Sequence, residues 1–156
     1  KIFTTRSAEE IADLERQTVE APHLRAAQRA LADDITDLVH SVAEREAATA
    51  AAGAIFGRGD LAELDAGTLA AVARELDAAT LPAGADLPSV VDVLAASGVV
   101  ESKGAVRRAI AEGGAYLNNQ RVTDPNAAVA ATDLLAGEYL VVRRGKRTVG
   151  AVRVLR

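Results

Sequence analysis

The 156-residue chain contains no cysteine, no methionine and no tryptophan, and its aromatic side chains are limited to two Tyr and two Phe. Without cysteine, neither a disulfide framework nor a thiolate metal site can form. Two histidines disfavour a structural zinc site. With aromatic residues at only 3%, the core has to be built from Ala, Leu, Val and Ile. Such a core suits helices that pack closely through small side chains.

Long apolar runs are also missing. No stretch approaches the ~20 apolar residues that cross a bilayer, and no signal peptide is visible. We therefore expect a soluble, cytoplasmic protein without a membrane partner. The sequence begins at Lys1, whereas a translated product begins with Met, which is normally removed only before a small residue. We expect a piece of a longer polypeptide whose catalytic motifs lie upstream.

Charge is divided unevenly along the chain. Residues 1–86 contain 8 Lys and Arg against 16 Asp and Glu, a net charge of −8. Residues 87–156 contain 10 basic against 6 acidic residues, a net charge of +4. Charge asymmetry between two halves is typical of proteins with a nucleic-acid-binding segment.

The acidic half has helical patterns. Ser7 and Glu10 have the spacing of a capping box, in which each side chain accepts from the other residue's backbone N–H. Pro22 suits the first turn of a second helix, and apolar residues then recur at spacings of three and four. We expect helices over residues 8–19, 22–51 and 66–78.

A break separates the two halves. Residues 79–88 contain two prolines and a glycine and follow neither the helical nor the strand period. The sequence therefore predicts an α-helical domain over residues 1–80, a linker at 81–88 and a second domain over 89–156.

The basic half begins with two predicted helices. Ser89 is a suitable N-cap for the first, which Gly98 ends. Ser102 caps the second, expected over residues 102–112, whose apolar face contains Val106 and Ile110. Lys103 and Arg107, four residues apart, form a basic stripe along the edge of that face.

Hairpins follow the basic helix. Asn118 and Asn119 tolerate the left-handed backbone that a tight hairpin turn needs. Residues 139–142 and 148–152 have the composition of strands, and a tip at residues 143–147 joins them. Four cations on this tip repel each other, which favours an anionic partner.

These motifs resemble a known RNA-binding module. Ser102-Lys103, Arg107, Ile110, Gly113 and the Tyr-Leu-Asn-Asn-Gln-Arg-Val hairpin are similar to the S4-like module of ribosomal proteins, pseudouridine synthases and bacterial tyrosyl-tRNA synthetases. The ending Val-Val-Arg-Arg-Gly-Lys-Arg resembles the synthetase C-terminus. Lys-Ile-Phe-Thr at residues 1–4, Arg-Ala-Ala-Gln-Arg-Ala-Leu-Ala at 25–32 and Leu-Val-His at 38–40 resemble its helical anticodon-binding domain.

The resemblance implies an α+β chain. A small helical anticodon-binding domain would precede an S4-like domain of two helices packed on a small, mostly antiparallel sheet. The chain would position tyrosine tRNA through its long variable arm and anticodon stem. The residues expected to bind RNA are polar or basic side chains of the second half: Ser102, Lys103, Arg107, Arg108, Asn118, Asn119, Arg121, Arg143, Arg144, Lys146 and Arg147.

The resemblance also implies a parent enzyme, a tyrosine–tRNA ligase that uses ATP and Mg in a catalytic domain absent from this chain. We expect no catalytic residue, no metal site and no cofactor in the chain itself. The parent would form a homodimer through its catalytic domain, and the piece would be a monomer. Two alternatives stay open, namely an S4-like module of an rRNA-modifying or ribosomal protein, and a helical protein-interaction domain with a basic tail.

Overall fold

The computed structural model describes residues 4–82 and 86–155. The chain forms two compact units, residues 1–49 and residues 50–156. The first is helical, and the second combines helices with a five-stranded sheet. The α+β class predicted from the sequence is confirmed.

The helical unit begins with α1 (Ala8–Glu20), a short 3-10 turn η1 (Pro22–Leu24) and α2 (Ala26–Val39). α3 (Val42–Ile55) starts in this unit, and its residues from Ala50 onward belong to the second. The predicted capping box is present. The Ser7 hydroxyl accepts from the Glu10 backbone N–H at 3.3 Å, and the Glu10 carboxylate accepts from that of Ser7 at 2.8 Å.

The single long helix predicted over residues 22–51 is wrong. Pro22 starts only a 3-10 turn, because Arg25 has a left-handed backbone with φ 52°. α2 ends before His40, and a new helix begins after Ser41, whose hydroxyl accepts from the Glu44 N–H at 3.2 Å. The apolar spacing continues across this break, so hydrophobic periodicity alone does not reveal it.

The sheet of the second unit has the strand order β1-β5-β4-β2-β3. The pair β1–β5 is parallel, and the other three pairs are antiparallel. The predicted mostly antiparallel sheet is therefore confirmed. The strands are β1 (Ala79–Pro82), β2 (Ala115–Leu117), β3 (Gln120–Arg121), β4 (Tyr139–Arg144) and β5 (Thr148–Leu155).

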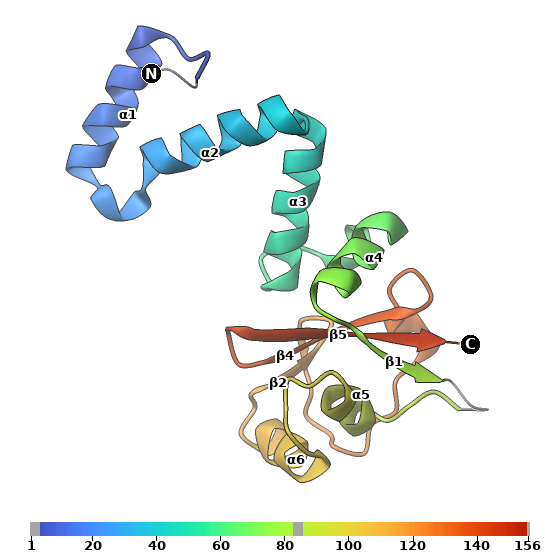
Figure 1. Cartoon of the computed structure of the whole chain (residues 1–156). Helices are drawn as coiled ribbons and strands as arrows, with labels where there is room; N and C mark the ends of the chain where they lie inside the picture. Colours follow the sequence, from blue (N-terminus) through green and yellow to red (C-terminus); the bar gives the residue numbers. More distant parts are fainter. Residues whose placement is uncertain (1–3, 83–85, 156) are drawn as a thin grey trace. The chain divides into compact units, whose positions relative to one another are not determined.

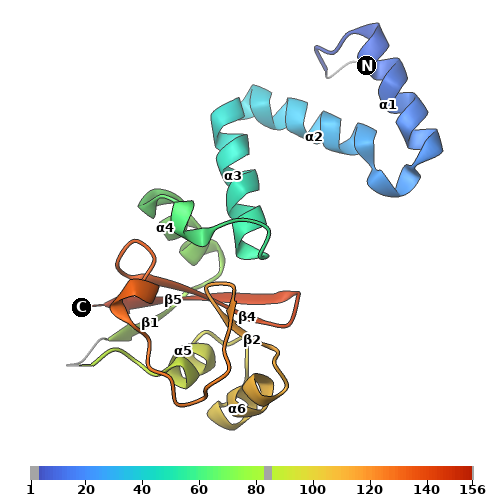
Figure 2. The ribbon, with the colours of Figure 1, turned by 180° about the vertical axis from the view of Figure 1, so that it is seen from behind.

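Helices cover both faces of this sheet (Figure 1), and Figure 2 shows the same arrangement from behind. Side chains of a strand alternate between faces. Leu140, Val142 and Val152 face the main core, beneath α5 (Val90–Ala96) and α6 (Lys103–Ala111). Tyr139 and Ala151 face the opposite way. On that second face, residues of η2 (Leu61–Glu63) and α4 (Ala66–Glu75) pack against the sheet. A third short 3-10 turn, η3 (Ala131–Asp133), comes before β4 in the chain.

The boundary between the compact units differs from the predicted linker at 81–88. Ala79 and Leu81 of β1 pack against the main core, and β1 pairs along its whole length with residues 152–155 of β5. α4 also packs on the sheet through Leu69 and Ala73. Residues 83–85 of the predicted linker lie outside the described residues.

Candidate nucleic-acid interface

α6 presents its cations because its opposite side is buried. Val106, Ala109 and Ile110 are at most 4% exposed and pack in the main core. The Ser102 hydroxyl accepts from the Ala105 backbone N–H at 3.2 Å and so caps the helix. Lys103, Arg107 and Arg108 are exposed. The predicted arrangement of a buried face beside a basic face is present.

The β2–β3 turn uses its two asparagines internally. Asn118 and Asn119 have φ values of 46° and 65°, the left-handed geometry of a tight hairpin turn. The Asn118 amide donates to the Asp133 carbonyl at 2.5 Å and accepts from the Val141 N–H at 3.0 Å. The Asn119 amide donates to the Ala54 carbonyl at 2.6 Å. Both side chains therefore hold the turn against the rest of the unit.

The predicted tip at 143–147 is partly strand. Arg143 and Arg144 belong to β4, opposite Val149 and Thr148 of β5. Residues 145–147 form the turn, where Gly145 has φ 64°. Since alternate side chains leave a strand on opposite faces, Arg143 and Arg144 point to different sides of the sheet.

The two basic segments lie side by side. β2, which follows α6, pairs with β4, so that Ala115 is opposite Arg144. The Gly145 backbone N–H donates to the Gly114 carbonyl at 2.7 Å. This contact brings the end of the basic helix segment to the start of the β4–β5 turn. The C-terminal end of the α6 segment and the turn that carries Lys146 and Arg147 are thus neighbours.

Arg143 differs from the other cations of the tip. Its guanidinium lies over the Tyr116 ring, 4.9 Å from the ring centroid. Its Nε is buried and has no hydrogen-bond partner among the residues that the structure describes. Tyr116 is the cross-strand neighbour of both Arg143 and Arg121. Arg143 is therefore held by packing, whereas Arg121 is exposed.

Few carboxylates neutralise this region. Lys103 Nζ lies 2.5 Å from Asp92 Oδ1. The ammonium of Lys103, and then the hydroxyl of Ser89, hold the pKa of Asp92 below its ordinary value. Within residues 4–82 and 86–155, no acidic partner lies within ion-pair distance of six of the expected RNA-binding cations: Arg107, Arg108, Arg121, Arg144, Lys146 and Arg147.

The pairing of Asp92 with Lys103 was not predicted from the sequence, although the position of Asp92 three residues after the Ser89 cap is visible there. Replacement Asp92→Asn removes the partner of Lys103 and one negative charge beside the basic helix. We expect affinity for RNA to rise about threefold, because exposed ion pairs are worth at most about 1 kcal/mol. Titration of a fluorescent tRNA with both proteins at low and high salt measures this. An unchanged affinity at low salt would remove Lys103 from the set of expected RNA contacts.

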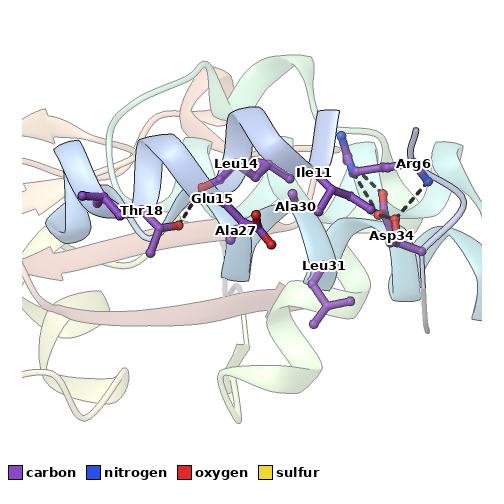
Figure 3. A pocket seen from close by; sticks show the side chains of 11 residues that line it. Arg6, Ile11, Leu14, Glu15, Thr18, Ala27, Ala30, Leu31 and Asp34 are labelled. Carbon is purple, nitrogen blue, oxygen red and sulfur yellow. Dashed lines mark hydrogen bonds and ion pairs between the residues drawn. The ribbon is translucent and has the colours of Figure 1, made fainter. Parts of the chain in front are cut away.

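The helical unit offers a different kind of surface. A hollow of about 490 Å³ lies between α1 and α2, lined mainly by apolar side chains such as Ile11 and Leu14 (Figure 3). At one end, the Arg6 guanidinium donates to both oxygens of Asp34 at 2.9 Å. This bond, and then that from Thr4, hold the pKa of Asp34 below its ordinary value. Because Asp34 neutralises Arg6, this hollow is a poor place for a phosphate.

Residues 4–82 and 86–155 contain neither a metal-binding cluster nor a membrane-spanning helix. In the part of the chain that the structure describes, no group of three or more His, Cys, Asp or Glu side chains could hold a metal ion. None of the helices described there is both long enough and apolar enough to cross a bilayer.

Comparison with known proteins identifies relatives along nearly the whole chain. The tyrosine–tRNA ligase of Cutibacterium acnes is 55% identical over 152 residues, covering 97% of this chain and 36% of that protein. That of Thermobifida fusca is 52% identical over 153 residues, covering 97% of this chain and 35% of that protein. The chain thus spans about a third of the length of these relatives.

A solution structure of a tyrosyl-tRNA synthetase C-terminal domain matches with 30% identity and a TM-score of 0.44, covering 62% of this chain and 96% of that one. Residues 70–151 match the family model of the tyrosine–tRNA ligase SYY-like C-terminal domain. The resemblance found in the sequence is confirmed. Since the match spans more than half of the 156 residues, the chain belongs to the tyrosine–tRNA ligase SYY-like C-terminal domain family.

Proposed function

We propose that this chain is the tRNA-binding region of a tyrosine–tRNA ligase and that its second unit binds the RNA backbone. The observation that carries the proposal is the Gly145–Gly114 hydrogen bond, which places two basic segments together. The proposed phosphate contacts are the exposed cations of these segments: Lys103, Arg107, Arg108, Arg121, Arg144, Lys146 and Arg147.

We infer that the other expected RNA-binding residues position the cations rather than contact the RNA. Ser102 caps α6, and Asn118 and Asn119 hold the β2–β3 turn through bonds to backbone groups. Arg143, stacked on Tyr116, supports the adjacent strand pair. These residues fix the places from which the cations reach the RNA.

Phosphate neutralisation explains affinity, and the shape of the RNA explains selectivity. Each cation that contacts a phosphate releases condensed counterions, so binding weakens as salt rises. Structured RNA is recognised largely through its backbone and overall shape. We infer that the partner is tyrosine tRNA, held at its long variable arm by the second unit and at its anticodon stem by the helical part of the chain.

The catalytic role belongs to the whole protein. Its relatives are ligases about three times the length of this chain. We propose that the full protein attaches tyrosine to tRNA with ATP and Mg bound in another domain, and that it forms a homodimer through that domain. This chain then acts by positioning the tRNA and is a monomer by itself.

Binding of two RNAs across a salt series tests the proposal. We expect tyrosine tRNA to bind at least tenfold more tightly than the same tRNA without its long variable arm, with a steep loss of affinity as salt rises. Equal and weak binding of both RNAs would contradict the ligase assignment. A lack of binding to either RNA would favour a protein-interaction domain instead.

A further inference from the structure

An aromatic side chain lies beside the cationic turn. Phe56, Arg58, Lys146 and Arg147 line an open hollow of about 470 Å³. The four side chains come from two segments about ninety residues apart in the sequence, and both segments belong to the second unit. The sequence gives no sign of this grouping, because the residues around position 56 follow an Ala-rich helix without a basic cluster.

Phe56 begins an exposed run, since residues 57–60 are exposed as well. Phe56 itself is 43% exposed, whereas Ala54 before this run and Leu61 after it are 2% and 3% exposed. Only apolar surface that is removed from water stabilises the fold, so a large aromatic side chain left partly in solvent contributes less to folding than a buried one. An exposed aromatic ring next to cations is the arrangement with which proteins bind unpaired nucleotides.

The segment that holds Phe56 is well fixed. α3 ends in a Schellman motif, in which the Arg58 N–H donates to the Gly53 carbonyl at 2.8 Å and the Gly57 N–H to that of Ala54 at 3.1 Å. The Asn119 amide also donates to the Ala54 carbonyl. The last carbonyls of the helix are thus occupied by donors, and Phe56 is held at the edge of the hollow.

The Arg143 guanidinium packs against the same segment, at Gly57. Gly57 has φ 79°, and a Cβ added to it would lie 3.1 Å from Nη2 of Arg143. Gly57 therefore permits both the left-handed cap and the close approach of the guanidinium. The segment carrying Phe56 and the hairpin carrying Lys146 and Arg147 are joined by packing, so the hollow between them is preorganised.

We propose that this hollow takes one unpaired nucleobase of the bound RNA, stacked on the Phe56 ring, with the flanking phosphates held by Arg58, Lys146 and Arg147. The inference rests on the proposed function and adds a stacking subsite to the phosphate surface. Arg58, Lys146 and Arg147 make no ion pair among the described residues, so each is free to contact phosphate. Stacking tolerates any base, because every base has a π-face.

Two variants of the whole chain test the subsite. Phe56→Leu keeps an apolar side chain but removes the ring, and we expect tyrosine tRNA to bind about tenfold more weakly with an unchanged salt dependence. Phe56→Trp keeps the ring and should bind at least as tightly as the parent. Because the chain contains no tryptophan, this variant also introduces a fluorescent probe at a single position. Stacking of a base on it should quench its emission.

The matched control is Leu155→Trp, at a position 44% exposed and outside the residues that line the hollow. We expect little quenching of that tryptophan by the same RNA. Normal tRNA affinity of Phe56→Leu, or an unquenched Phe56→Trp protein that still binds RNA, would overturn the stacking subsite and leave the proposed function standing. A parent protein that does not bind tRNA would overturn both.

Discussion

Reversing the charge of Arg107 and Arg144 together is expected to weaken tRNA binding on the order of 100-fold without unfolding the protein. Both side chains are exposed and have no acidic partner within ion-pair distance among the described residues. Each replacement by Glu removes one proposed phosphate contact and adds a repulsive charge. The slope of log affinity against log salt should fall by about 2, one for each lost contact.

Arg74→Glu is the matched control for each single reversal. Arg74 is exposed near the end of α4, outside the two basic segments, and its replacement makes the same change in net charge. We expect its tRNA affinity to fall far less than that of Arg107→Glu or Arg144→Glu. The second measurement is the thermal unfolding temperature of each variant. A loss of stability comparable to that of a core variant would identify Arg107 or Arg144 as a structural residue.

Gly150→Val is expected to destabilise the second unit by about 3 kcal/mol. Gly150 lies in β5, opposite Val142. A Cβ added there would lie 2.7 Å from Cγ1 of Val99 and 3.2 Å from the Ser97 carbonyl oxygen. The backbone between α5 and α6 cannot move away without disturbing the helices. Chemical denaturation of the whole chain, followed by near- and far-ultraviolet circular dichroism, measures the change.

The control for this variant is Gly53→Ala. Gly53 lies in α3, and apart from its own helix backbone a Cβ added to it meets no atom of residues 4–82 and 86–155 within 4 Å. Because alanine is the better helix former, we expect stability to rise by up to about 1 kcal/mol. Similar losses for the two variants would show that backbone flexibility, rather than the close approach of Val99 and Ser97, explains the need for glycine at position 150.

Local features of the fold could be predicted from the sequence. The capping box at Ser7, the buried face of α6 and the left-handed turn at Asn118 and Asn119 each depend on residues a few positions apart. Their conformations follow from backbone sterics and short-range hydrogen bonds. For the same reason, the basic helix and the β4–β5 hairpin could each be predicted from its own local sequence.

Features that join distant segments could not be predicted in this way. The parallel partner of β1 is β5, more than 70 residues away, and four residues ending in proline have no distinctive strand pattern. The pairing of Lys103 with Asp92 and the approach of Arg143 to Gly57 also depend on tertiary packing. The outlines of the proposed RNA-binding surface were therefore visible in the sequence, but its supporting contacts and the Phe56 hollow were not.

The parallel pairing of β1 with β5 determines the smallest piece of the chain that can keep this sheet. A truncation starting at residue 89 would remove both β1 and α4. β5 would then become an unpaired edge whose free N–H and C=O groups invite pairing with other chains. The apolar surface at Tyr139 and Ala151, now packed against α4, would face water. The smallest piece of the chain that keeps the whole sheet therefore starts before α4, within the sequence that composition alone assigns to the acidic half.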